Sequence, residues 1–263
     1  MKTIKTNDGV SLAYSDEGTG KPVVFVPGYS ISRHSWSMQK QAFLDQGYRV
    51  ITLDRRNHGA SDRPSFGQRM SRHGKDLHDF ITGLELEDVL LIGNSMGAST
   101  IFAYVSLFGD DQLSGIVDID QTPKMINDAN WEYGMYSINR ESAATFFDAP
   151  LPGPLYKLVD PGFLMELAKE TADLPAFDLE TTKPLLLDHA HADWLDILPL
   201  IDVPVLFIAG RNSPFWPCEH AAASAALCKN GQAVVIEDCG HVVNWEQPAI
   251  CNEKLLEFAK SIY

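Results

Sequence analysis

The sequence predicts an α/β protein with a mainly parallel central sheet and helices on both faces of that sheet. Short apolar runs alternate with longer segments in which apolar residues recur every three or four positions. The short runs are almost continuously apolar, as expected of parallel strands that are buried on both faces. No internal repeat or low-complexity tract interrupts this alternation.

Six of the short runs are predicted strands: Val23–Val26, Arg49–Leu53, Asp88–Ile92, Gly115–Ile119, Val205–Ala209 and Ala233–Ile236. Upstream of them, the turn signals at Asp8-Gly9 and at Gly18 and Gly20 predict an antiparallel hairpin that leads into the sheet. Apolar spacing predicts helices in five further segments: Trp36–Gln46, Arg72–Leu84, Ala98–Leu107, Cys218–Cys228 and Ala249–Ile262.

The alternation of strands and helices stops between residues 123 and 194. This stretch is rich in proline and aromatic residues and contains helical pieces such as Gly162–Ala172. We therefore expect a core made of residues 1–122 and 195–263, with residues 123–194 inserted as a helical cap. A cap of this kind would shield a site at the sheet edge from water.

Composition and charge restrict the class of protein. Of the 263 residues, 45% are hydrophobic and 21% are charged, which indicates a folded globular protein rather than a disordered or fibrous one. The net charge of −14 disfavours nucleic acid and anionic membrane surfaces as partners, so we expect a small-molecule substrate. We find neither the apolar stretch of a signal peptide nor a run of ~20 apolar residues, and expect a cytoplasmic protein. The oligomeric state stays open.

The strongest functional signal is the pentapeptide Gly93-Asn94-Ser95-Met96-Gly97. It directly follows a predicted strand and opens a predicted helix, which is the order of a nucleophile elbow. The turn in such an elbow is so tight that small residues must stand two positions on either side of the nucleophile, and both glycines are present. The G-x-S-x-G pattern is common by chance, but in this context it predicts that Ser95 is a catalytic nucleophile.

A serine hydroxyl is a weak nucleophile at neutral pH and needs a general base within hydrogen-bond reach. Among eight histidines, His241 is the candidate. It follows the last predicted strand and precedes the final helix, so it belongs to a loop at the carboxyl edge of the sheet, where ligands bind in such folds. It also follows the serine in chain order, as the elbow architecture requires.

Together these motifs resemble the α/β-hydrolase superfamily, and within it the esterases and the cofactor-free chloroperoxidase-like members. The matching stretches are Val26-Pro27-Gly28-Tyr29, the DRRNHGAS run at 54–61, the elbow and Gly240-His241, and they extend over nearly the whole chain except the predicted cap. The resemblance implies the α/β-hydrolase fold. It also implies an oxyanion hole made by the backbone N–H groups of Tyr29 and Met96.

The acid that orients the histidine is where this sequence departs from the superfamily pattern. Relatives usually carry an aspartate shortly after the strand VLFIAG, but here the loop reads Gly210-Arg211-Asn212-Ser213-Pro214. Either Asn212 serves weakly or a carboxylate comes from elsewhere. We favour Asp120, because some members draw the acid from the preceding strand and the D-Q-T-P run resembles a subgroup with serine in the usual acid position. Asp118 is a deeper alternative on the same face of that strand.

The expected activity is that of a serine hydrolase, most simply a carboxylesterase that acts on a small, mainly apolar ester through an acyl-enzyme. Candidate pocket residues are Trp131, Tyr136 and Phe146 in the predicted cap and Val242 beside the base. The same site could serve a lactonase, a carbon–carbon bond hydrolase or a perhydrolase with haloperoxidase-like activity. A further alternative is a ligand-binding or signalling homologue whose catalysis is weakened by the missing aspartate.

We expect no cofactor and no metal. The sequence contains neither a dinucleotide-binding fingerprint nor a phosphate-binding loop. His189, His191 and Asp193 alternate along a predicted helix, which spreads them around its circumference rather than gathering them as metal ligands.

Overall fold

The computed structural model describes residues 1–263. Eight strands form one sheet in the spatial order β1-β2-β4-β3-β5-β6-β7-β8. The strands are β1 (Lys2–Lys5), β2 (Ser11–Glu17), β3 (Pro22–Val26), β4 (Arg49–Leu53), β5 (Val89–Asn94), β6 (Leu113–Ile119), β7 (Val205–Gly210) and β8 (Gly231–Ile236). Strand β2 is antiparallel to both β1 and β4, and all other neighbours are parallel. The predicted α/β class, the mainly parallel sheet and the N-terminal hairpin are confirmed.

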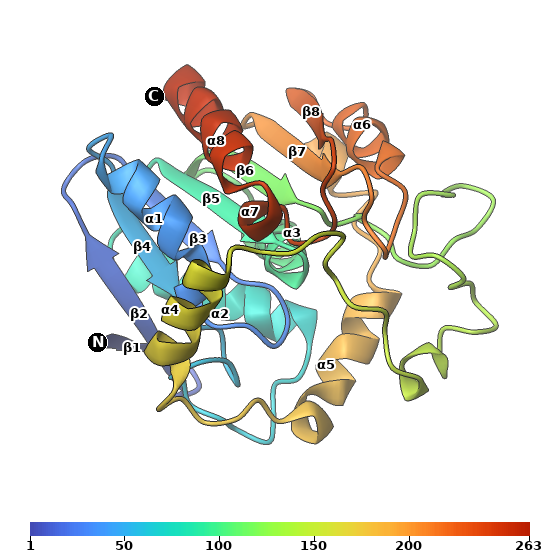
Figure 1. Cartoon of the computed structure of the whole chain (residues 1–263), viewed down its shortest axis with the longest axis horizontal. Coiled ribbons are helices and arrows are strands. Elements are labelled where there is room, and N and C mark those ends of the chain that lie inside the picture. Colours follow the sequence, from blue (N-terminus) through green and yellow to red (C-terminus); the bar gives the residue numbers. More distant parts are fainter.

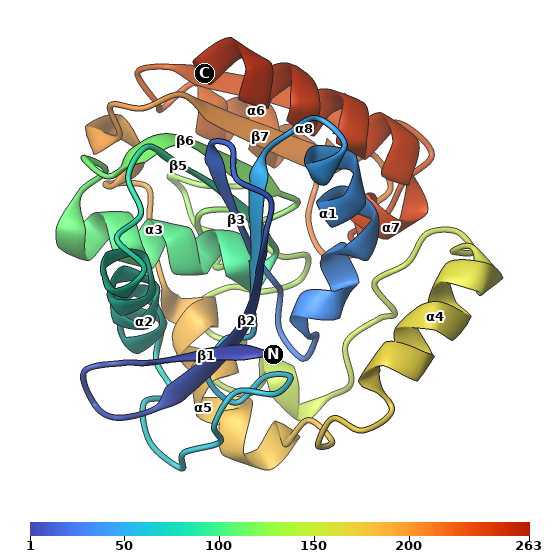
Figure 2. The same ribbon diagram turned by 90° about the vertical axis from the view of Figure 1, so that its left-hand side faces the viewer.

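Helices cover both faces of the sheet (Figure 2). They are α1 (Ser37–Leu44), α2 (Met70–Gly83), α3 (Met96–Phe108), α4 (Pro161–Thr171), α5 (Leu179–His191), α6 (Glu219–Ala225), α7 (Val243–Glu246) and α8 (Pro248–Ile262), with short 3-10 helices at Arg33–Trp36, Phe146–Asp148 and Leu198–Leu200. None of the helices combines the length and the apolar character that crossing a membrane requires.

Alternation along the strands divides the core between the two faces. In β3, Val23 and Phe25 pack with the residues of α1 and α8, whereas Val24 and Val26 pack with those of α2, α3 and α6. Successive side chains of a strand point to opposite faces, so a strand buried on both sides must be apolar throughout. This explains why the continuous apolar runs were reliable signals of strands.

The predicted helices of this part of the chain are present, with boundaries that differ by a few residues. Helix α6 ends at Ala225, before the predicted Cys228. The chain must turn there to enter β8, and Gly231 approaches the Ala225 carbonyl so closely that a Cβ would overlap it. The shorter helix is therefore a consequence of the packing of α6 against β8.

The order of the strands reverses at β3, which has β4 on one side and β5 on the other. At such a switch point the connections leave in opposite directions and open a crevice outside the carboxyl ends of the strands. Gly28 follows β3 and Ser95 follows β5, so both stand at this crevice. The strand order thus brings together two motifs that lie far apart in the sequence.

The long connection between β6 and β7 carries α4 and α5 and runs past the carboxyl edge of the sheet (Figure 1). Helix α4 matches the predicted piece Gly162–Ala172 and is capped at its N-terminus by Asp160, whose side chain accepts hydrogen bonds from the N–H groups of Gly162 and Phe163. Helix α5 continues through Pro184. A small apolar cluster joins this connection to the loop after β7; its buried members are Met125, Met135, Ile138, Ala143, Ala190, Phe215 and Trp216.

Candidate active site

Ser95 stands in the turn between β5 and α3, with φ 54° and ψ −131°. This backbone conformation is unfavourable for a residue with a Cβ and is found mainly where function requires it. A Cβ on Gly93 would overlap the backbone of Ala98, and one on Gly97 would overlap the carbonyl of Val26. Both glycines are thus required by the close approach of helix and strand, and the turn leaves Ser95 partly exposed between buried neighbours.

Two backbone N–H groups near Ser95 have no acceptor within the protein. Met96 is the first residue of α3, so its N–H has no intrahelical partner. Tyr29 lies in the turn after β3, and its N–H makes no hydrogen bond to any protein group. A Cβ on Gly28 would stand only 3.3 Å from the Ser95 Cβ, which shows how close this turn is to the serine. The arrangement offers two free donors beside one hydroxyl.

His241 lies on the loop between β8 and α7, and its Nδ1 is 2.7 Å from Oδ2 of Asp120. The two residues are 121 positions apart in the chain. Asn212 is exposed, and Asp118 uses one carboxylate oxygen to accept the N–H of Gln121. Of the three acid candidates, only Asp120 makes a hydrogen bond with His241.

Two further hydrogen bonds hold the Asp120 carboxylate. The N–H of Gly210 donates to Oδ1 at 2.9 Å, and the hydroxyl of Ser213 donates to Oδ2 at 2.7 Å. Ser213, in the loop after β7, therefore contacts the aspartate at the end of β6. The sequence indicated no role for Ser213, and only the pairing of β6 with β7 brings its loop to Asp120.

The pKa values of Asp118, in β6, and of Asp120, directly after β6, are shifted in opposite directions. Burial by itself raises the pKa of Asp120, but its contacts with His220 and His241 outweigh burial and lower that pKa to about 2. For Asp118, burial and the nearby charge of Asp120 raise the pKa well above its ordinary value. Asp120 is thus ionised at neutral pH and suited to accept from an imidazole N–H, whereas the surroundings of Asp118 disfavour its charged form.

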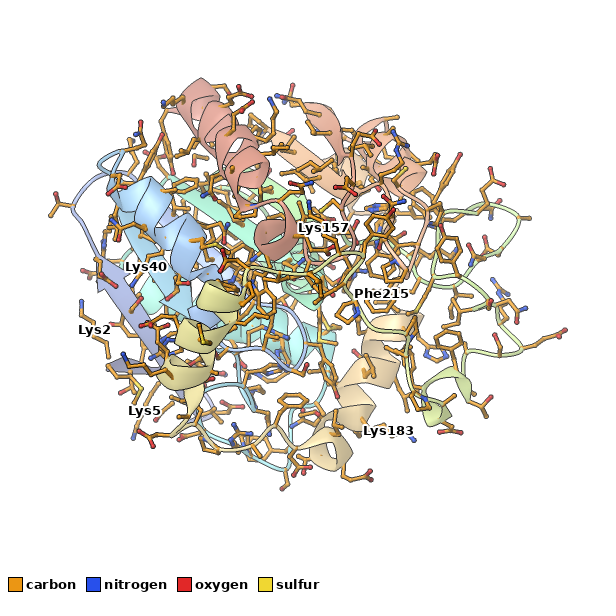
Figure 3. All side chains as sticks on the ribbon, in the orientation of Figure 1. Lys2, Lys5, Lys40, Lys157, Lys183 and Phe215 are labelled. Atoms are coloured by element: carbon orange, nitrogen blue, oxygen red, sulfur yellow. The ribbon has the colours of Figure 1, made fainter.

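Glu246 in α7 binds the histidine loop to the long connection. It is buried, and its carboxylate accepts the N–H groups of Gly240 and Val242 on one side and of Tyr156 and Lys157 on the other. Lys157 lies beside α7 in Figure 3. The N–H of His241 itself donates to the carbonyl of Pro154 at 3.0 Å. Sequence reasoning missed this carboxylate, because nothing in the local pattern indicates four backbone donors from two distant segments.

A cavity of about 280 Å³ lies against these groups. Ser95, His241, Tyr29 and Met96 all belong to its wall. The hydrogen bonds of the structure do not include one between the Ser95 hydroxyl and His241, a bond that often forms only when substrate binds. Most of the remaining wall is apolar and is contributed by Met125, Met135, Phe147, Leu151, Leu186, Phe215, Trp216, Val242 and Trp245.

Residues 21–248 match the family described as the alpha/beta hydrolase fold. The chain belongs to this family. It is 31% identical to the non-heme chloroperoxidase of Streptomyces lividans, over 99% of this chain and 100% of that one. It is 26% identical to the bifunctional esterase/perhydrolase DCH of Acinetobacter calcoaceticus, over 99% and 100%. The crystal structure of a bromoperoxidase from Bacillus anthracis superimposes with a TM-score of 0.85 at 27% identity, covering 98% of this chain and 99% of that one.

Of the four residues predicted to line the pocket of this α/β hydrolase, three do not belong to the cavity wall. Val242 belongs to the wall, but Trp131, Tyr136 and Phe146 do not. Trp131 is buried and donates its Nε1–H to the Thr122 hydroxyl, and Tyr136 is 49% exposed. Phe146 packs edge-on against Phe147, which takes the place at the cavity.

Two aromatic residues at the base were missed from the sequence. The rings of Phe215 and Trp216 have their centroids 4.6 and 5.2 Å from that of His241. Phe215 lies between α5 and the end of the sheet (Figure 3). The available signal was their position just after Ser213-Pro214, in the loop that the superfamily pattern associates with the acid.

His189 is a buried polar residue of the cavity wall, and it comes from the C-terminal end of α5. Burial, helped by Arg55 and His241, lowers its pKa to about 3, so the ring is neutral at physiological pH. Its Nδ1 has no hydrogen-bond partner. His191, two residues further on, is exposed, and the structure gathers no group of three or more His, Cys, Asp or Glu side chains that could hold a metal ion.

Proposed function

We propose that this protein is a serine hydrolase that cleaves a small, mainly apolar carboxylic ester through an acyl-enzyme. The proposal depends most on one observation, the 2.7 Å contact between His241 Nδ1 and Asp120 Oδ2 beside the cavity that Ser95 also lines. A carboxylate in this position keeps the proton on Nδ1, leaving Nε2 as the basic nitrogen. An imidazole oriented in this way can activate a serine hydroxyl.

In the proposed reaction the Ser95 Oγ attacks the ester carbonyl while His241 takes the hydroxyl proton. The N–H groups of Tyr29 and Met96 bind the oxyanion that forms. Neither group donates to an acceptor in the protein, so no hydrogen bond has to break first. His241 then returns the proton to the leaving alcohol, and the acyl group stays on Ser95. Water, activated by His241, attacks the acyl-enzyme and releases the carboxylic acid.

The substrate class follows from the cavity. Its volume of about 280 Å³ is at the lower end of ligand sites, and most of its wall is apolar. His189 adds a neutral polar ring, which favours uncharged substrates. We assign residues 123–194 as the cap, because this segment supplies Met125, Met135, Phe147 and His189 to the wall while the sheet core supplies the reacting groups.

A perhydrolase activity is the second candidate. It is favoured by the similarity to a non-heme chloroperoxidase and to a bifunctional esterase/perhydrolase. In this reaction hydrogen peroxide replaces water in the attack on the acyl-enzyme, so the products are a peracid and free Ser95. The same residues carry both reactions, and the ratio of peracid to acid formed from one ester measures their balance.

Replacing the nucleophile tests the proposal. Ser95→Ala should lower the turnover of short p-nitrophenyl esters by about a thousandfold or more, because the remaining groups cannot form an acyl-enzyme. Ser99→Ala is the matched control, since Ser99 lies one turn further along α3 and its hydroxyl has no partner. A fluorophosphonate should label the wild type and the control but not Ser95→Ala. Retained turnover in Ser95→Ala would exclude the serine mechanism, and absence of labelling in the wild type would favour the ligand-binding alternative.

A further inference from the structure

Arg55 is a buried cation, 3% exposed, in the loop that follows β4. Its Nε donates to the carbonyl of Pro27 at 2.9 Å, and its Nη2 donates to the carbonyl of Gly28 at 2.7 Å. The guanidinium also contacts Nδ1 of His73 at 3.2 Å and Nε2 of His58 at 3.1 Å. Two adjacent carbonyls of the turn after β3 are therefore held by one side chain.

All four of these partners are neutral. His58 uses its Nδ1–H to bond the carbonyl of Arg56 at 2.8 Å, which leaves Nε2 as an acceptor. Burial and the charge of Arg55 hold the pKa values of His58 and His73 well below their usual range, so neither ring becomes charged. Burial also lowers the pKa of Arg55 itself to about 9, which still leaves it charged at neutral pH.

The neighbouring arginine has a different environment. Arg56 is also buried, but it pairs with Asp76 and with Asp8. The carboxylate of Asp54, next to Arg55 in sequence, pairs with Arg33 instead. A buried charge without a counter-ion is costly, and proteins normally avoid it. Arg55 is such a charge, and its position needs a reason other than a salt bridge.

The geometry of the peptide group supplies that reason. The Gly28 carbonyl and the Tyr29 N–H belong to one planar trans peptide and point in opposite directions. A guanidinium that holds the carbonyl therefore directs the N–H away from Arg55, and it polarises the peptide so that the N–H becomes a stronger donor. This N–H has no acceptor in the protein, and Tyr29 lines the cavity together with Ser95.

We propose that Arg55 is a positioning residue of the oxyanion hole, which orients the Gly28–Tyr29 peptide and supplies a positive potential for the oxyanion. This inference rests on the proposed serine mechanism. The oxyanion exists only after Ser95 has attacked. The positive charge of Arg55 therefore attracts the negative charge that develops in the transition state more strongly than it attracts the neutral bound ester. An interaction of that kind accelerates the chemical step and leaves ground-state binding almost unchanged.

The test compares three variants in the full-length enzyme. Arg55→Met removes the charge and both donors, and Arg55→Lys keeps the charge but cannot bridge two carbonyls in the same way. Arg63→Met is the matched control: Arg63 also donates to backbone carbonyls, those of Asn57, Gly59, Pro175 and Ala176, but not to the turn after β3. Each is measured for kcat and KM on p-nitrophenyl butyrate. Each is also measured for affinity toward a trifluoromethyl ketone, which forms an oxyanion adduct with serine, and toward the methyl ketone of the same shape.

We expect Arg55→Met to lower kcat by about tenfold to a hundredfold, at or below the effect of losing one oxyanion donor. The affinity for the trifluoromethyl ketone should fall by the same factor, while KM and the affinity for the methyl ketone change by less than about threefold. Arg55→Lys should lie between Arg55→Met and the wild type, and Arg63→Met should leave the ratio of the two ketone affinities unchanged. The inference is overturned if folded Arg55→Met behaves like Arg63→Met, or if its loss is confined to KM.

A measurement on the wild type keeps the inference testable even if the Arg55 variants fail to fold. In a crystal structure of the trifluoromethyl ketone adduct, the adduct oxygen should accept the Tyr29 N–H at about 3 Å while Arg55 holds the Gly28 carbonyl. An oxygen bound away from Tyr29 would refute the role of Arg55. Failure of the serine mechanism has a separate signature, because Ser95→Ala would then retain turnover; failure of the Arg55 inference alone leaves Ser95 labelling intact.

Discussion

The carboxyl edge of the sheet and the segment of residues 123–194 differ in what determines the positions of their side chains. At the edge, Asp120 is fully buried and is held by a backbone N–H, a hydroxyl and an imidazole. In the segment, the regular structure is two helices and one short 3-10 turn, and large apolar side chains such as Leu158 and Met165 are 96% and 70% exposed. The edge thus provides fixed polar geometry, and the segment mainly provides shape. Changes at the edge should alter the rate of reaction, and changes in the segment should alter the choice of substrate.

The largest expected effect in this comparison is at Asp120. Asp120→Asn should lower kcat by about a hundredfold to ten-thousandfold, because an amide can present its NH₂ to the ring and so favour the wrong tautomer of His241. Asn212→Ala is the control, since Asn212 is exposed and does not contact the histidine. Steady-state kinetics on a p-nitrophenyl ester measure both. If Asn212→Ala collapses the rate and Asp120→Asn does not, the assignment of the acid is wrong.

A smaller and different effect is expected at the cavity wall. Met135→Ala and Phe147→Ala remove apolar side chains from the wall and so enlarge the cavity, without altering the groups around Ser95. The ratio of kcat/KM for an octanoyl ester to that for an acetyl ester should rise by about tenfold or more, since even one methylene in an apolar pocket is worth about this much. Met165→Ala, on the exposed face of α4, should leave the ratio unchanged. An equal loss for both esters would show that the segment acts on the chemical step, as the carboxyl edge does.

The smallest expected effect concerns the stability of the edge. The pKa of Asp118 is higher in the folded state than in the unfolded state. Its contribution to the free energy of unfolding is therefore fully present below the unfolded-state pKa and is lost as pH rises through the folded-state pKa. Asp118→Asn removes this loss, so its Tm relative to the wild type should rise as pH increases above the ordinary pKa of an aspartate. The lowered pKa of Asp120 has the opposite sign: its contribution is present above the unfolded pKa and is lost as pH falls toward about 2.

Thermal unfolding of both asparagine variants over this pH range separates the two carboxylates. Asp120→Asn should be less stable than the wild type at neutral pH, and the deficit should shrink below pH 4. If the two variants instead show the same pH dependence, the buried carboxylates do not differ in protonation. The opposite directions of the two pKa shifts would then be wrong.

Local sequence patterns were sufficient to predict a structural feature wherever the residues that form it are neighbours in the chain. The elbow at Ser95 could be predicted because the strand, the tight turn and the helix follow one another within a few residues and carry the G-x-S-x-G pattern. The strands could be predicted because burial on both faces demands an uninterrupted apolar run. Because the last strand could be recognised in this way, the sequence also placed His241 in the loop at the carboxyl end of that strand.

Contacts between distant segments were beyond such patterns. Whether Asp120, Asp118 or Asn212 faces His241 depends on how β6, β7 and the loop after β8 meet, and a shift of two residues along one strand changes the answer. The cavity wall shows the same limit, because Phe146 and Phe147 are adjacent and chemically identical, and only packing decides which one faces the cavity.

Arg55 and Arg56 illustrate the limit most clearly. In the sequence they are an adjacent pair of identical charges. In the folded chain, α2 supplies Asp76 to Arg56, whereas the turn after β3 supplies Arg55 with carbonyl oxygens. Residue type and order establish an α/β hydrolase with a serine at its elbow. The partners of each charge depend on which segments are packed together, because electrostatic and hydrogen-bond energies act through distances in space rather than along the chain.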